Sequence, residues 1–119
     1  MLPVVHNPNY QAIFPPGHRF PMGKFGAVAR VLTDLGFAPF HTPAPAPASW
    51  IALAHDRAYV DQVLAAEVPA RIAREIGFPM TPSVALRART ACAGTTLTAR
   101  LALDNGIACN TAGGSHHAR

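Results

Sequence analysis

The last thirteen residues, 107–119, read I-A-C-N-T-A-G-G-S-H-H-A-R. Ile107 to Cys109 is a short apolar run, and Gly113-Gly114 breaks it, so the pattern predicts a short strand that ends in a glycine loop. In α/β proteins, functional groups collect just beyond the carboxyl ends of parallel strands. His116 and His117 follow the predicted strand end, and histidine is the side chain best suited to proton transfer near neutral pH. This stretch therefore predicts an α/β fold with a catalytic site at its end.

Other interpretations of the histidine pair remain open at this point. Adjacent histidines also occur in disordered tails and in remnants of purification tags. Zinc takes three or four protein ligands, and no Asp, Glu or Cys lies within a few residues of His116 and His117 to complete a set. The pattern favours acid–base chemistry over a metal site.

The rest of the chain predicts alternating strands and helices. The expected elements are a strand at 2–5, a helix at 23–35, a strand at 50–54, helices at 57–66, 70–76 and 82–103, and a strand at 107–109. This alternation predicts α/β layering with a parallel sheet. The Pro/Ala-rich segment 38–49 is expected to be a surface loop, because the 37 residues before it are too few for an independent domain.

Local signals predict how several helices begin and pack. Phe25, Val28, Leu32 and Leu35 recur at helical spacing and should form one apolar face. Asp56 is expected to cap the helix that follows it. The helix at 82–103 is rich in small residues, which lets other elements approach closely, so it should be packed on more than one side.

The composition limits the classes of function. The chain has 119 residues, of which 50% are hydrophobic and 13% charged, with a net charge of +4. The basic residues form no cluster of the kind that nucleic acids require, so no direct nucleic-acid partner is expected. No signal peptide and no apolar run of about 20 residues is evident, so the sequence predicts a cytoplasmic protein with no membrane association.

The two cysteines predict neither a disulfide framework nor a structural zinc site. Cys92 and Cys109 lie far apart and form no C-x-x-C pair. They are expected to be small apolar residues of the core.

Several motifs, taken in order, resemble the histone deacetylase superfamily, most closely its bacterial and class IV-like members. The tail N-T-A-G-G-S-H-H-A-R at 110–119 resembles that family's Gly-Gly-x-His-His-Ala segment. The stretches G-H-R-F-P-M-G-K-F at 17–25, H-D-R-A-Y-V-D-Q-V-L at 55–64 and G-F-P-M-T-P at 77–82 resemble segments that precede it, as do Arg87 and A-G-T-T-L-T-A at 93–99.

The resemblance implies a fold, a reaction and a cofactor. It implies part of an arginase- and deacetylase-like three-layer fold with a central parallel sheet. Members of the family hydrolyse acetyl-amide bonds on lysine or polyamines with a bound zinc ion. His116 and His117 match the catalytic pair, in which one histidine acts as general base and the other as acid or electrostatic partner.

The chain departs from the family pattern after these histidines. The family's zinc ligands, an Asp-x-His pair and a later Asp, come after them, as does a catalytic tyrosine. We therefore expect residues 1–119 to be the N-terminal part of one deacetylase domain, truncated after the tandem-histidine loop. Such a chain should be inactive and bind no zinc specifically by itself. The alternatives are a small non-enzymatic α/β interaction module, or one half of a split deacetylase that assembles with the missing C-terminal part.

Overall fold

The computed structural model describes residues 2–115, which form helices around a small parallel sheet. The elements in chain order are β1 (Val4–Val5), the 3-10 helix η1 (Pro8–Tyr10), α1 (Lys24–Asp34), α2 (Ala48–Ile51), α3 (Arg57–Leu64), α4 (Ala70–Ile76), α5 (Pro82–Asn105) and β2 (Cys109–Asn110). The mixture of helices with a parallel sheet agrees with the predicted α/β class.

The sheet joins the two ends of the chain. β1 and β2 run parallel, with Val4 opposite Cys109 and Val5 opposite Asn110. On its other side β1 forms a parallel bridge between Val5 and His41. Both residues of β1 are buried, because this strand lies between β2 on one side and the segment at His41 on the other.

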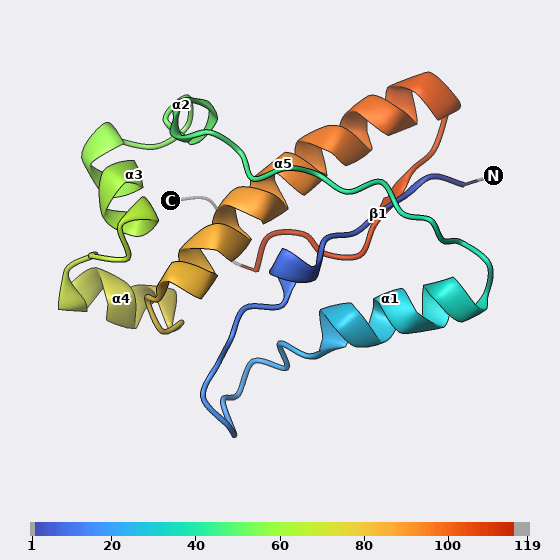
Figure 1. Cartoon of the computed structure of the whole chain (residues 1–119). Coiled ribbons are helices and arrows are strands. Elements are labelled where there is room, and N and C mark those ends of the chain that lie inside the picture. Colours follow the sequence, from blue (N-terminus) through green and yellow to red (C-terminus); the bar gives the residue numbers. More distant parts are fainter. Residues whose placement is uncertain (1, 116–119) are drawn as a thin grey trace.

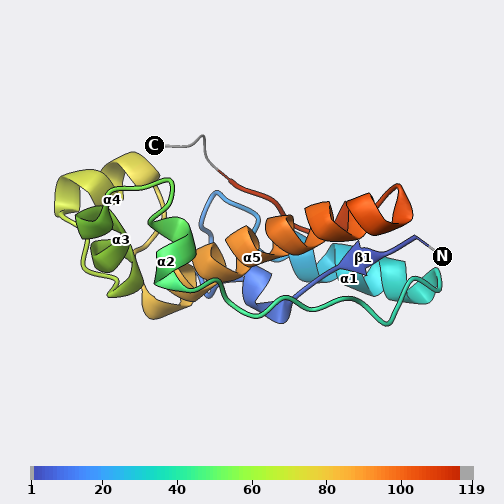
Figure 2. The ribbon, with the colours of Figure 1, turned by 90° about the horizontal axis from the view of Figure 1, so that it is seen from above.

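The long helix α5 runs through the middle of the molecule. The Thr81 hydroxyl accepts a hydrogen bond of 3.3 Å from the Val84 amide at its start, and Gly106 ends it in the left-handed region at φ 84°. Figures 1 and 2 show α2, α3 and α4 gathered where α5 begins, with α1 toward its other end. α5 contacts η1, both strands and α3, which confirms that this helix is packed on more than one side. Its buried residues lie between Val84 and Gly94.

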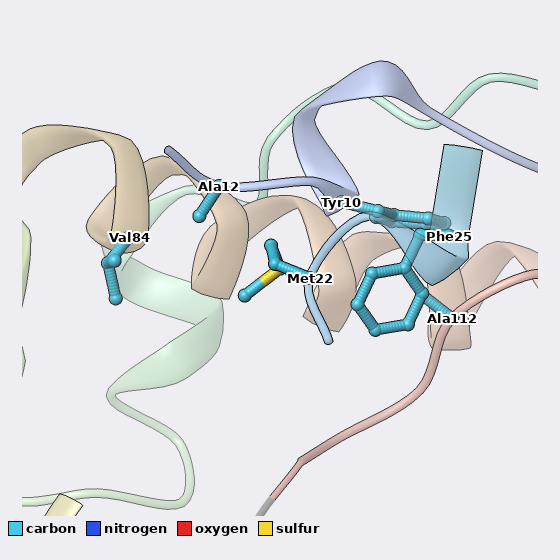
Figure 3. Packing of buried hydrophobic residues seen from close by; sticks show 6 residues of the cluster. All are labelled: Tyr10, Ala12, Met22, Phe25, Val84 and Ala112. Carbon is cyan, nitrogen blue, oxygen red and sulfur yellow. The ribbon is translucent and has the colours of Figure 1, made fainter. Parts of the chain in front are cut away.

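The main hydrophobic cluster links the N-terminal segment to α5 and to the segment after β2. Its buried members are Tyr10, Ala12, Met22, Phe25, Val84 and Ala112. Figure 3 shows the rings of Tyr10 and Phe25 close to Ala112. The core therefore lies directly beside the strand end where the sequence predicts a site.

The predicted strand at 50–54 is wrong. This segment belongs to α2 and the turns after it, and Ala48 to Ile51 are helical. Periodicity does not separate a buried strand from a short helix in a run of five apolar residues. Pro47 precedes the helix, where its fixed φ is tolerated, and Ala48 favours helix.

The Pro/Ala segment is more than a surface loop. Ala46 is buried, its amide donates to the Arg89 carbonyl at 3.1 Å, and its carbonyl accepts from Arg89 Nε at 2.9 Å. Nearer the sheet, the Asn7 side chain donates to the Pro43 carbonyl at 2.8 Å. The backbone groups of this proline-rich segment form few sheet hydrogen bonds. Residues of α5 and of the segment after β1 bind them instead.

The predicted burial of the cysteines and the predicted side-chain cap at Asp56 are also wrong. The expected apolar face of α1 is only partly covered, since Val28 and Leu35 are exposed while Phe25 is buried. Asp56 stands at the N-cap of α3 but makes no capping hydrogen bond with its side chain. Both cysteines are free and exposed rather than part of the core.

A close contact on α5 predicts an unequal response of two helical glycines to alanine. A Cβ on Gly94 would lie 1.8 Å from the Tyr10 hydroxyl oxygen, which is buried and hydrogen-bonded. We expect Gly94→Ala to lower the free energy of unfolding by about 2 kcal/mol, because overpacking outweighs the gain in helix propensity. Urea denaturation measures this difference.

Gly26→Ala on α1 is the matched control. Its Cβ would lie 2.6 Å from Oε1 of the exposed Gln11 side chain and 3.6 Å from Nη1 of Arg30, and both atoms stand at the far ends of flexible side chains. We expect stability to stay unchanged or to rise by up to about 1 kcal/mol from helix propensity. Equal effects of the two substitutions would contradict the packing of Tyr10 on Gly94.

Candidate active site

The residues that follow β1 and β2 meet at one edge of the sheet. Parallel strands end on the same side, so His6 after β1 lies beside Thr111 after β2. The Nδ1 atom of His6 and the Oγ1 atom of Thr111 form a hydrogen bond of 2.7 Å, and the Thr111 amide donates to the Val5 carbonyl at 3.0 Å. The ends of β1 and β2 are therefore joined by a side-chain hydrogen bond as well as by a backbone hydrogen bond.

The predicted catalytic residues His116 and His117 lie outside the described residues. The structure describes the segment before them as far as Ser115. Ala112 is buried in the main cluster, while Gly113, Gly114 and Ser115 are exposed. The chain thus passes from the core to the surface over the glycines that precede the histidine pair.

Tyr10 contacts the start of the segment that leads to the histidines, at Asn110. Its hydroxyl donates a hydrogen bond of 2.9 Å to Asn110 Oδ1, and its side chain is fully buried. Burial raises the pKa of the Tyr10 hydroxyl, although the hydrogen bond to Asn110 and the charge of Arg87 act in the opposite direction. The phenol therefore remains a neutral donor at physiological pH.

Arg87 is a buried cation next to the same tyrosine. Its Nε donates to the Tyr10 carbonyl at 2.8 Å, and its Cζ lies 4.9 Å from the centre of the Phe25 ring. Burial lowers the pKa of the guanidinium, and the interaction with Tyr10 opposes this. The ring and the carbonyl stabilise a charge that burial would otherwise make costly.

The motifs of the sequence assign no role to His6, Tyr10 and Asn110. A signal for Arg87 is present, because Val84, Arg87, Ala91 and Gly94 recur at steps of three, four and three on one face of the long helix. All four are buried. An arginine within a stripe of small and apolar residues indicates a buried cation that needs partners.

The described residues do not supply a zinc site. Within 2–115, no group of three or more His, Cys, Asp or Glu side chains is placed to hold a metal ion. Structural and catalytic zinc sites use at least three protein ligands. The donor set of this part of the chain therefore does not fit zinc.

Lys24 lies at the surface near this core. It is the first residue of α1 and is exposed, and its Nζ lies 4.8 Å from the centre of the Phe20 ring and 5.4 Å from that of Phe25. The ammonium group is thus held over aromatic faces at the helix start.

In the part of the chain that the structure describes, no helix is long and apolar enough to cross a lipid bilayer.

A family model for the histone deacetylase domain matches residues 18–119, which include α1 to α5, β2 and the tandem-histidine segment. The chain belongs to the histone deacetylase domain family. This confirms the resemblance carried by the Gly-Gly-x-His-His-Ala segment and the weaker motifs before it.

This histone deacetylase family chain is also similar to a longer relative. It is 40% identical over 119 residues to an uncharacterized protein of Picosynechococcus sp.. The match covers 98% of the chain and 40% of that relative, so the chain spans less than half of the relative's length.

The half-buried His6 predicts a pH dependence of stability in this family member. Burial lowers the pKa of its imidazole from 6.5, so the unfolded chain binds the proton more readily than the folded chain. The stability that neutral His6 contributes is present above pH 6.5 and is lost as the pH falls toward the folded-state pKa. The stability advantage of wild type over His6→Asn should shrink between about pH 7.5 and pH 5.

Urea denaturation of both proteins across this range checks the prediction. A difference in unfolding free energy that stays constant with pH would show that His6 titrates alike in the folded and unfolded chain.

Proposed function

We propose that this chain is the N-terminal part of a single deacetylase domain whose complete form hydrolyses acetyl-amide bonds on lysine or polyamine substrates. The observation that carries the proposal is the family match through residue 119, which includes the tandem histidines after a parallel strand. The family is generally zinc-dependent, and zinc would supply an activated water when bound in the complete domain.

In this proposal His116 and His117 divide the proton transfers of amide hydrolysis. One accepts a proton from the attacking water, and the other stabilises charge or donates to the leaving amine. Ala112, which is buried in the main hydrophobic cluster, anchors the segment that precedes the two histidines.

We further propose that residues 1–119 do not carry out this reaction without more protein. The chain matches 40% of the length of its relative, and residues 2–115 hold no cluster of three metal ligands. Large apolar side chains are also exposed, with Leu53 and Leu103 each 88% accessible and Ile107 61%. In a complete cytoplasmic enzyme, further strands and helices would cover these side chains.

Activity and metal measurements test the proposal. We expect the purified 119-residue chain to contain no stoichiometric zinc and to leave acetyl-lysine peptides and acetylated polyamines intact. A longer product of the same gene should bind zinc and hydrolyse one of these substrates. In that product, His116→Ala or His117→Ala should lower kcat by roughly 10²- to 10⁴-fold, while His41→Ala, which changes a different loop, should not.

Two results would contradict the proposal. Zinc-dependent hydrolysis by the 119-residue chain would refute its incompetence. DNA beyond codon 119 that encodes no Asp-x-His segment in any reading frame would refute the assignment to a longer deacetylase domain.

A second candidate is a non-enzymatic interaction module, which the exposed Leu53, Trp50 and Leu103 favour. It requires a chain that folds independently or as an oligomer. A cooperative thermal transition with a monodisperse species would support the module. Aggregation would support the partial domain, whose exposed strand edge and apolar faces lack cover.

A further inference from the structure

We propose that the Tyr10 hydroxyl is a positioning group for the tandem-histidine segment: through Asn110 it fixes the course of residues 110–112, from which that segment departs. The inference rests on the proposed function for the chemical role of His116 and His117. Tyr10 lies before residue 18, where the family match begins, so the role is assigned from contacts and not from the match.

Three successive residues at the strand end are each held by a different contact. Asn110 accepts the Tyr10 hydroxyl at 2.9 Å, and Thr111 is bonded to His6 at 2.7 Å. Ala112 is buried against the same cluster as Tyr10, and its amide lies 3.5 Å from Asn110 Oδ1. The Asn110 oxygen thus faces both the tyrosine hydroxyl and the backbone that leads to the glycines.

Tyr10 itself has little freedom to move. Arg87 Nε holds its carbonyl at 2.8 Å, and the His6 ring meets its ring edge-on at 5.8 Å between centroids. Gly94 lies against its hydroxyl, where any side chain would collide with the oxygen. Two residues of α5 therefore hold Tyr10 in place, Arg87 at its carbonyl and Gly94 at its hydroxyl. The position of this hydroxyl then determines where the Asn110 side chain lies.

The two glycines after Ala112 add little to this order. Gly113 and Gly114 are exposed, and nothing lies within 4 Å of a Cβ built on Gly113. Glycine has the widest range of accessible backbone conformations. The contacts of residues 110–112 therefore set the direction in which the chain enters the two glycines.

Hydrogen exchange and NMR on the 119-residue chain test this role without metal or substrate. In Tyr10→Phe we expect the Thr111 and Ala112 amides to exchange about fivefold faster than in wild type, the effect of one lost hydrogen bond. Exchange on α1 should be unchanged. The Gly113 and Gly114 amide resonances should shift, and so should the titration of the His116 and His117 imidazole nitrogens.

Thr33→Val is the matched control. It removes the hydroxyl of an exposed residue of α1, which donates to the Ala29 carbonyl at 2.9 Å in the same helix, far from residues 110–112 in the chain. The substitution should leave the amide exchange and the resonances of residues 111–117 unchanged. Asn110→Ala, which removes the acceptor at a half-buried position, should reproduce the local changes and decides the matter if Tyr10→Phe does not fold.

Three outcomes would overturn the inference. They are random-coil resonances for Gly113 and Gly114 in wild type, equal effects of Tyr10→Phe and Thr33→Val at these glycines, and an unchanged segment in Asn110→Ala. Because none of these readouts needs catalysis, the positioning role and the deacetylase assignment can fail separately.

Discussion

The pairing of β1 with β2 is the constraint on which the rest of the fold depends. It brings together residues more than a hundred positions apart, as the hydrogen bond between His6 and Thr111 illustrates with a separation of 105. Two residues a strand give little stability from backbone hydrogen bonds alone. The pairing persists because Val4 and Val5 are buried and because side chains close the strand ends.

The long helix α5 makes this short sheet possible. Its small residues let η1 and both strands pack against it, and at Gly94 the Tyr10 hydroxyl lies against the helix. The same face carries Arg87, whose contacts with the Tyr10 carbonyl and Phe25 join η1 and α1 to the helix. A single helical face thus orders the N-terminal segment and, through Tyr10, the strand end at which the family's histidines follow.

The sequence predicts the elements with strong local signals. The helices predicted at 70–76 and 82–103 match α4 and α5 closely, because breaking residues bound both segments. The strand predicted at 107–109 overlaps β2 only at Cys109, since β2 spans Cys109–Asn110. The strand predicted at 50–54 is wrong because five apolar residues have no distinguishing period. The contacts around Asn110 and the path of residues 38–49 arise from tertiary packing across distant segments, which no local pattern encodes. His116 and His117 remain predictions, since they lie outside the described residues.

The distance along the chain between β1 and β2 also governs the order in which the protein can fold during synthesis. β1 is made first, but its partner β2 is made about a hundred residues later. Until then, Val4 and Val5 have no strand to pair with on that side, and Tyr10 has no Asn110 to receive its hydroxyl. Long-range strand pairing is slow, because the closure of a long loop precedes the favourable contacts. The strand end that bears the candidate site is therefore completed only after α5 and β2 have been made.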